Sequence, residues 1–259
     1  MFNDVPESRW SHGLIKRAVQ AGLLEGFPDD TFRPGEPVTR EQAAAIAVRI
    51  VENIPGNQLI EENLPSNVVI HHYVGDDGGL GSGVWIEPWK VLTNAHVVAT
   101  RDGEKGQHVV YGYEGAGFDP TGAMDAEVEA INHEYDLALL NVDKPPYGSL
   151  IDLRTVELGP TPIRGDKVWA IGAPFGMPWD AVDGVLRHPQ RRVNYWHEPQ
   201  VMFGLSAGIN PGNSGGGLFN VYGEFVGVPS AGWVGANVFT FAVPVHQVKL
   251  FMRNAGYEY

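Results

Sequence analysis

One glycine-rich segment, residues 210–217, limits the folds open to this chain more than any other stretch. Its sequence, Asn-Pro-Gly-Asn-Ser-Gly-Gly-Gly, sets a rigid proline and several glycines around Ser214. Glycine and proline are unfavourable inside helices and regular strands, so the segment predicts a tight loop. Such a loop can present the Ser214 hydroxyl and several backbone N–H groups to one point. Alone, it fits a surface turn as well as a catalytic loop, and the decision depends on its partners.

The residues after this loop exclude one class of serine enzyme. Residues 212–216 also fit Gly-x-Ser-x-Gly, the nucleophile elbow of α/β-hydrolases, in which a helix follows the serine and an acid and a histidine come later. Here residues 218–227 predict a β-hairpin instead. After Ser214 the chain offers only Glu224, Glu258 and His246, and too few residues for the rest of that fold.

The composition favours a soluble, β-rich protein. The 259 residues include 33 glycines and 19 prolines, which implies many turns, and 43% are hydrophobic. Acids and bases are interspersed at a net charge of −13, which argues against general affinity for nucleic acid or anionic membranes. Cysteine is absent, so disulfides, a thiol nucleophile and thiolate metal sites are excluded. A cytoplasmic and an exported bacterial protein both fit that absence.

Membrane, leader and cofactor signals are missing from the sequence. No apolar run approaches the roughly 18 residues of a membrane-spanning helix, and residues 1–6 lack the charged and apolar regions of a signal peptide. Gly79, Gly81 and Gly83 precede no predicted helix, which rejects dinucleotide binding. His71 and His72 would point to opposite faces of a strand and have no third ligand at a suitable spacing, so we expect no metal and no cofactor.

The first fifty residues predict two helices joined by a turn-rich loop. The first helix ends near Gly22, and its apolar stripe consists of Trp10, Leu14, Ile15, Ala18 and Val19. The second helix begins at Thr39, which can form a capping box with Gln42. Its apolar stripe consists of Ala43, Ile46, Ala47 and Ile50. Residues 54–66 lose helical periodicity and carry proline, glycine and asparagine, which predicts a linker.

This N-terminal pattern resembles an S-layer homology (SLH) repeat over residues 1–53. The matching blocks are residues 2–6, Trp10, 26–29, 31–34 and 38–42. The resemblance implies binding of acidic secondary cell-wall polysaccharide, with Arg40 as the cation that faces the glycan. It also implies a location at the cell surface or outside the cell. Arg40 equally fits a solvated residue in a first helical turn, and SLH anchors usually have three repeats where this chain has one.

From residue 67 to residue 259, short apolar runs separated by turns predict a second, β-rich domain. Residues 83–86 and 90–93 predict a hairpin that leads to His96, a residue that fits a packed histidine as well as a catalyst. Asp136 lies directly before the apolar strand 137–140, where an acid is costly to bury unless a partner compensates. Among the acids between His96 and Ser214, Asp136 is the best candidate to be buried against an imidazole.

The ordered set His96, Asp136 and Ser214 predicts nucleophilic catalysis. A serine hydroxyl needs a base, and a neutral imidazole can serve if an acid fixes its tautomer and stabilises its protonated form. Backbone N–H groups of Gly212 and Ser214, with Asn213 between them, can form the oxyanion hole.

The second domain resembles the protease domain of the HtrA/Deg group of trypsin-like serine proteases over residues 67–252. Five blocks match in family order: residues 93–98, 136–140, 170–176, 209–216 and 241–244. The resemblance implies two six-stranded β-barrels with the triad between them, and hence a mainly β protein with a small helical SLH repeat in front. Members of the group usually carry a C-terminal PDZ domain, which this sequence lacks.

The same resemblance implies a specificity and an activity. The base of the primary pocket would lie at Gly208 and Ile209, without a carboxylate, so we expect small or medium aliphatic P1 residues. Asn213 replaces the aspartate that captures a new N-terminus in digestive relatives, so we expect no activation cleavage of that kind. The leading hypothesis is a serine endopeptidase acting on polypeptides. The alternative is a non-catalytic cell-wall-binding or structural module, and a homo-oligomer is compatible with either.

Overall fold

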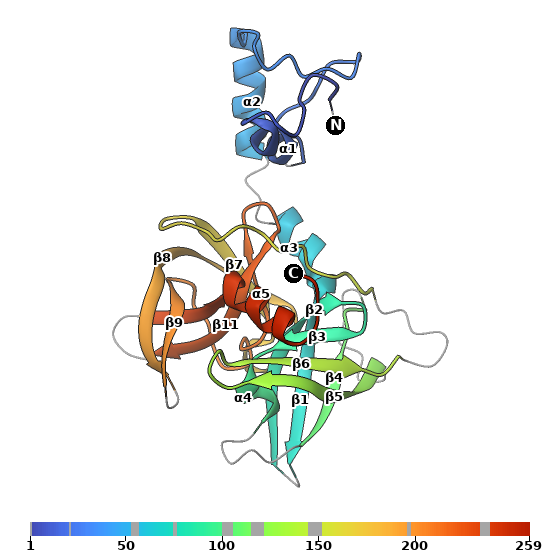
Figure 1. The fold of residues 1–259 in the computed structure, drawn as a ribbon, viewed down its shortest axis with the longest axis vertical. Coiled ribbons are helices and arrows are strands. Elements are labelled where there is room, and N and C mark those ends of the chain that lie inside the picture. The colour runs from blue at the N-terminus through green and yellow to red at the C-terminus, as the bar shows by residue number, and fades with distance from the viewer. Residues whose placement is uncertain are drawn as a thin grey trace. The chain divides into compact units, whose positions relative to one another are not determined.

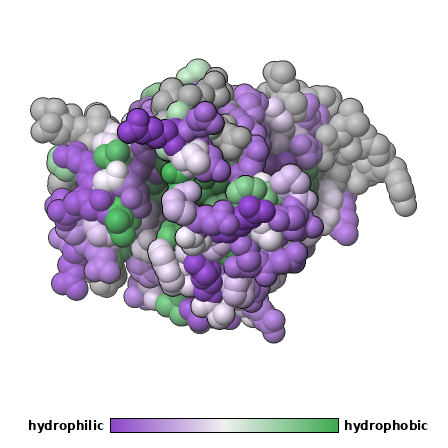
Figure 2. All heavy atoms as spheres, turned by 90° about the horizontal axis from the view of Figure 1, so that it is seen from above, coloured by the Kyte–Doolittle hydropathy of each residue, from purple (hydrophilic) through white to green (hydrophobic). Residues whose placement is uncertain are grey.

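The computed structural model describes residues 2–20, 22–52, 57–74, 77–99, 106–114, 122–144, 152–195, 198–233 and 239–259. The chain forms two compact units, Met1–Gly56 and Asn57–Tyr259 (Figure 1). Within the described residues, no helix combines the length and the apolar character needed to cross a membrane. The face in Figure 2 is largely hydrophilic, and its hydrophobic residues form small patches.

The first unit contains α1 (His12–Gln20) and α2 (Arg40–Glu52). The capping box is confirmed: the Thr39 N–H donates to Gln42 Oε1 over 2.9 Å, and the Gln42 N–H donates to Thr39 Oγ1 over 3.1 Å. The stripe predicted for the first helix was partly wrong, because Trp10 lies before α1 with 84% of its surface exposed, and only Ile15 is buried in that helix. The Asp4 carboxylate accepts the Phe32 N–H, which lowers the Asp4 pKa.

The segment expected as a linker is mostly ordered in the second unit. Residues 57–66 form α3 (Asn57–Asn63) and the 3₁₀ turn η1 (Leu64–Ser66), whereas residues 53–56 lie outside the described residues. The physical reason is burial: Leu59 and Leu64 are 5% and 7% exposed and belong to the main apolar core. These two leucines compensate for a sequence whose local pattern favours irregular structure.

The second unit begins with a closed barrel of six antiparallel strands. The strands are β1 (Asn67–Val74), β2 (Asp77–Glu87), β3 (Lys90–Thr93), β4 (Gln107–Tyr111), β5 (Ala123–Asn132) and β6 (Leu137–Val142), in the order β1-β2-β3-β6-β5-β4. The predicted hairpin is confirmed as β2–β3. Apolar residues of alternating strand positions, among them Ile70, Val91 and Leu140, fill the interior.

A second closed barrel follows with the same number of strands. Its strands are β7 (Lys167–Gly172), β8 (Asp180–Tyr195), β9 (Glu198–Leu205), β10 (Gly217–Asn220), β11 (Phe225–Trp233) and β12 (Phe239–Pro244), in the order β10-β11-β12-β9-β8-β7. The hairpin predicted after the glycine-rich loop is confirmed as β10–β11. The expectation of a mainly β protein with two six-stranded barrels is therefore confirmed.

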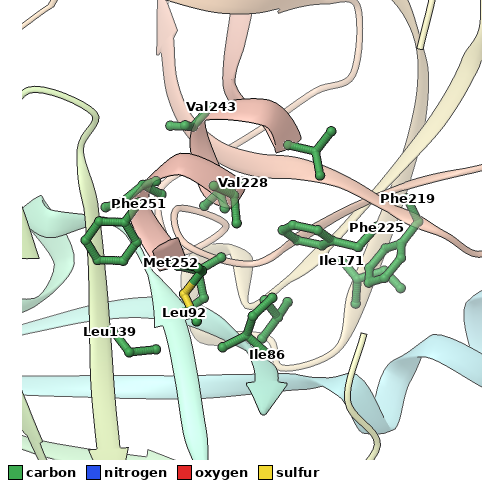
Figure 3. Close-up of a cluster of buried hydrophobic side chains, with 14 of the residues drawn as sticks. Ile86, Leu92, Leu139, Ile171, Phe219, Phe225, Val228, Val243, Phe251 and Met252 are labelled. Atoms are coloured by element: carbon green, nitrogen blue, oxygen red, sulfur yellow. The ribbon is translucent and has the colours of Figure 1, made fainter. Parts of the chain in front are cut away.

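The C-terminal helix α5 (Val245–Asn254) joins the two barrels through a shared core. Ile86 and Leu139 from the first barrel and Phe225 from the second belong to one buried cluster with Phe251 and Met252 of α5 (Figure 3). Burial of these side chains fixes one barrel against the other, because close-packed interiors resist displacement. Loops that start from different barrels can therefore meet with a defined geometry.

Candidate active site

His96 and Asp136 come from neighbouring strands of the first barrel. His96 lies in the short helix α4 (Ala95–Val98) directly after β3, and Asp136 directly precedes β6. Because β3 pairs with β6 at Thr93 and Ala138, both residues emerge at the same end of the barrel. The His96 Nδ1 atom lies 2.9 Å from Asp136 Oδ2 and 3.0 Å from Oδ1.

The Asp136 carboxylate is buried and held by several donors. The residue is 2% exposed, and its Oδ1 atom also accepts the His96 backbone N–H over 3.1 Å. The Asn94 side-chain amide donates to the Asp136 carbonyl oxygen over 2.8 Å, which steadies a backbone with φ of +53°. A carboxylate against Nδ1 places the imidazole proton on that nitrogen and leaves the Nε2 lone pair available as a base.

Ser214 is connected to this pair through a residue that the sequence analysis missed, Ser230 of β11. The Ser214 hydroxyl donates to the Ser230 carbonyl oxygen over 2.9 Å, and the Ser230 hydroxyl donates to Asp136 Oδ2 over 2.5 Å. Ser230 is 2% exposed. One signal was available: a serine that ends a buried apolar strand segment needs a hydrogen-bond partner.

The carbonyl groups of residues 211–214 in the glycine-rich loop each accept a hydrogen bond from a specific donor. The conformation depends on glycine at one point, because Gly212 has φ of +103° and a Cβ there would lie 2.1 Å from the Ala173 carbonyl oxygen. The donor–acceptor pairs are Phe175 N to Pro211 O (2.9 Å), Ser82 Oγ to Gly212 O (2.7 Å), Gly216 N to Asn213 O (3.1 Å) and Ser82 N to Ser214 O (2.8 Å).

Two N–H groups in residues 211–217 of this loop have no partner among the described residues. The Asn213 N–H donates to Asn210 O over 3.0 Å and the Gly215 N–H to Pro229 O over 2.9 Å. Within the described ranges, the N–H groups of Gly212 and Ser214 have no acceptor. Unpaired backbone donors in a folded loop are unusual and fit a site for an anionic or polarised oxygen. Of the three residues expected at the oxyanion hole, Asn213 thus uses its N–H within the turn.

The other residues singled out from the sequence lie in different surroundings. Ile209 is 8% exposed and packs into the second barrel's core, whereas Gly208 is half-buried and a Cβ there would meet only Val182, at 4.0 Å. The Asn213 side chain is buried, and among the described residues its Oδ1 atom has no partner. Arg40 is an exposed first residue of α2, in the other unit.

The histidines set aside as metal ligands are paired differently. His72 Nδ1 lies 3.0 Å from His108 Nε2, which lies 2.8 Å from the Val98 carbonyl oxygen. Across the part of the chain that the structure describes, no group of three or more His, Cys, Asp or Glu side chains is arranged to hold a metal ion.

Comparison with known proteins gives one family match in each unit. The family model of the trypsin-like peptidase domain matches residues 81–228, and that of the S-layer homology domain matches residues 2–44. Among curated relatives, the chloroplastic protease Do-like 1 of Arabidopsis thaliana is 30% identical over 74% of this chain and 45% of its own length. A probable periplasmic DegP-like serine endoprotease of Halomonas elongata is 29% identical over 88% of this chain and 49% of its own length.

A solved structure of a serine endoprotease from Yersinia pestis is similar with a TM-score of 0.62 and 27% identity, over 77% of this chain and 65% of that one. The chain spans about half the length of the two curated relatives. The family model covers more than half of the chain and both β3–β6 and the nucleophile loop. The chain therefore belongs to the family of trypsin-like peptidases, with an S-layer homology domain at its N-terminal side.

Proposed function

We propose that the chain is a serine endopeptidase that hydrolyses peptide bonds through a Ser214–His96–Asp136 triad and an acyl-enzyme. The observation that carries the proposal is a continuous set of contacts. Asp136 holds the imidazole of His96, Ser230 links Asp136 to the Ser214 hydroxyl, and two unpaired N–H groups lie in the same loop as Ser214. The similar proteins from Halomonas elongata and Yersinia pestis, both described as serine endoproteases, support the same reaction class.

Each part then has a step in the reaction. The Ser214 Oγ atom attacks the carbonyl carbon of the scissile bond while its proton moves to His96 Nε2, and Asp136 stabilises the imidazolium. The oxygen of the tetrahedral intermediate accepts the N–H groups of Gly212 and Ser214. When the intermediate collapses, the C–N bond breaks and His96 returns the proton to the leaving amine. The same imidazole then takes a proton from a water molecule that attacks the acyl carbon, the bond to Ser214 Oγ breaks, and His96 returns the proton to that oxygen.

The test of this activity is labelling by a fluorophosphonate probe, which forms a covalent bond with an activated serine. We expect the full chain to be labelled and the Ser214→Ala variant to remain unlabelled, with unchanged thermal unfolding. A well-folded wild-type chain that takes no label would favour the alternative, a non-catalytic module with a protease-like scaffold.

We further propose that the P1 side chain is small or medium aliphatic, such as Val, Ala, Ile or Leu. Gly208 carries no charge, and a Lys or Arg side chain beside it would be buried without a partner. Two peptide series that differ only at P1 test this preference. Faster cleavage after Arg than after Val would contradict the proposal.

For the first unit we propose attachment to acidic cell-wall polysaccharide, and therefore a location at the cell surface. The match to the S-layer homology domain and the exposed Arg40 support it. We expect Arg40→Ala to lower the fraction of chain retained by polymer-bearing cell walls. Lys16→Ala removes another exposed cation, from α1, and is the control. Equal retention of both variants would assign Arg40 no specific role.

A further inference from the structure

A buried serine of the first barrel reaches across to the nucleophile loop of the second. Ser82 lies in β2 and is fully buried. The preceding residue, Gly81, packs against Val97, the neighbour of His96, so closely that a Cβ on Gly81 would collide with the Val97 side chain. Neither the triad nor the oxyanion hole as proposed above includes it.

The contacts of Ser82 divide into those that any residue could make and those that need its hydroxyl. Its backbone N–H donates to Ser214 O over 2.8 Å, a bond independent of the side chain. Its Oγ atom donates to Gly212 O over 2.7 Å and accepts the Ala173 N–H over 2.9 Å. Only a side chain that is donor and acceptor at once can satisfy both groups.

These two bonds restrict the backbone around Gly212, whose N–H is a proposed oxyanion donor: one acts on the Gly212 carbonyl and the other on Ala173, two residues before Phe175. Gly212 has peptide planes on both sides, and glycine allows both to rotate with little steric cost. The plane before it is held at Pro211 O by the Phe175 N–H, from the turn that follows Ala173. The plane after it is held at Gly212 O by the Ser82 hydroxyl. The Gly212 N–H lies opposite the Pro211 carbonyl across a trans peptide, so the bond from Phe175 sets its direction, and the bond from Ser82 restricts the adjoining rotation about Gly212.

We propose that Ser82 is a positioning residue for the oxyanion hole: from the first barrel, its hydroxyl holds the Gly212–Asn213 peptide and the Ala173 N–H, and so restricts the backbone on which the direction of the Gly212 N–H depends. The proposal rests on the proposed serine-endopeptidase function. Ser82 touches neither substrate nor reacting atoms, and it acts through Gly212 and Ala173. It also makes the geometry of the oxyanion hole depend on the contact between the two barrels, since donor and acceptor come from different ones.

Ser82→Ala removes the hydroxyl and leaves Gly212 O and Ala173 N–H buried without their partner. Direct loss of an oxyanion-hole donor costs roughly 10²–10³ in kcat. Ser82 acts on this donor only indirectly, so we expect a smaller loss, of about tenfold in kcat. KM should stay unchanged, because the ground-state carbonyl depends less on these donors than the transition state does.

The matched control is Ser66→Ala. Ser66 is also fully buried, and its hydroxyl donates to the Asn63 carbonyl oxygen over the same 2.7 Å, but it lies in η1, outside the nucleophile loop. Both variants lose one buried serine hydroxyl, so their thermal stabilities provide a comparison of structural cost. Proton NMR of the Nδ1–H between His96 and Asp136 reports separately on the triad.

In the full chain, we expect Ser82→Ala to lose kcat while KM, the Nδ1–H resonance and the unfolding temperature match those of Ser66→Ala. Equal kcat in the two variants, or a change confined to KM, would overturn the proposal. If Ser82→Ala does not fold, Ser82→Cys replaces it, since a thiol is a weaker donor and acceptor; an intermediate loss of kcat supports the proposal and full activity overturns it. Failure of the proposed function shows itself differently, as a wild-type chain without labelling or hydrolysis.

Discussion

The conformation of Gly212 leads to a prediction that separates catalysis from stability. In Gly212→Ala, the new methyl group would lie 2.1 Å from the Ala173 carbonyl oxygen, 3.0 Å from the Ala173 carbonyl carbon and 3.2 Å from the Phe175 nitrogen. All three are backbone atoms, so no side-chain rotation can make room. The backbone φ of +103° is also one that alanine rarely adopts.

The two costs of this substitution can be estimated separately. An unfavourable φ costs on the order of 1–3 kcal/mol, which corresponds to a fall of roughly 2–12 °C in Tm for a chain of this size. The clash forces the Gly212 peptide to move, and its N–H then no longer points into the oxyanion hole. Loss of one such donor lowers kcat by about 10²–10³, or about 2.7–4 kcal/mol in the activation free energy.

The chain provides its own control for the first cost. Gly165 has φ of +96°, and a Cβ there would have no atom within 4 Å. Gly165→Ala therefore carries the conformational cost without the clash. The assay is steady-state hydrolysis of a peptide that the wild type cleaves, with thermal unfolding of each variant followed in parallel.

We expect both alanine variants to lose Tm and only Gly212→Ala to lose kcat by two orders of magnitude or more. A Gly212→Ala enzyme that keeps kcat within tenfold of wild type would refute the assignment of its N–H to the oxyanion hole. A variant of Gly165 that loses as much kcat would show that the assay reports general destabilisation.

Two further predictions concern side chains. Asp136→Asn should lower kcat about 10⁴-fold at neutral pH, because an amide that donates to His96 Nδ1 forces the imidazole proton onto Nε2 and removes the base. Steady-state kinetics measure the loss of kcat, and a loss of less than tenfold would contradict the proposed role of Asp136. The pKa of His72 is lowered by burial and then by the nearby His108. Below about pH 6.5 the unfolded chain therefore binds more protons than the folded chain. The unfolding free energy consequently decreases as the pH is lowered. Urea unfolding between pH 7 and pH 5 should show a flatter dependence for His72→Gln, and an unchanged slope would argue against this effect.

Features coded by local sequence were predictable without the structure. The Thr39–Gln42 capping box needs only a spacing of three residues, and the hairpins around residues 87–89 and 222–224 need only turn residues between apolar runs. The glycine-rich loop is likewise local, because the positive φ of Gly212 requires glycine at that position. Backbone propensity and short-range hydrogen bonding act over a few residues, so a single amino-acid sequence is enough to predict these features.

Other features depend on burial, which a local pattern does not contain. Residues 57–66 have the composition of a linker, yet Leu59 and Leu64 pack into the main core and order a helix there. Trp10 has the spacing of a core residue and is exposed. Ile209, expected at the substrate pocket, packs into the interior of the second barrel.

The sequence by itself was enough to predict the proposed chemistry: His96, Asp136 and Ser214 in that order, in a chain without cysteine. Only the tertiary structure decided how that chemistry is supported. Ser230 reaches Asp136 across 94 residues of chain, and Ser82 reaches Gly212 across 130. Such contacts exist only once both barrels have closed and packed together, because a single hydrogen bond cannot offset the entropy of bringing distant segments together. The packed core brings these segments together, and the two serines then set the geometry of the site.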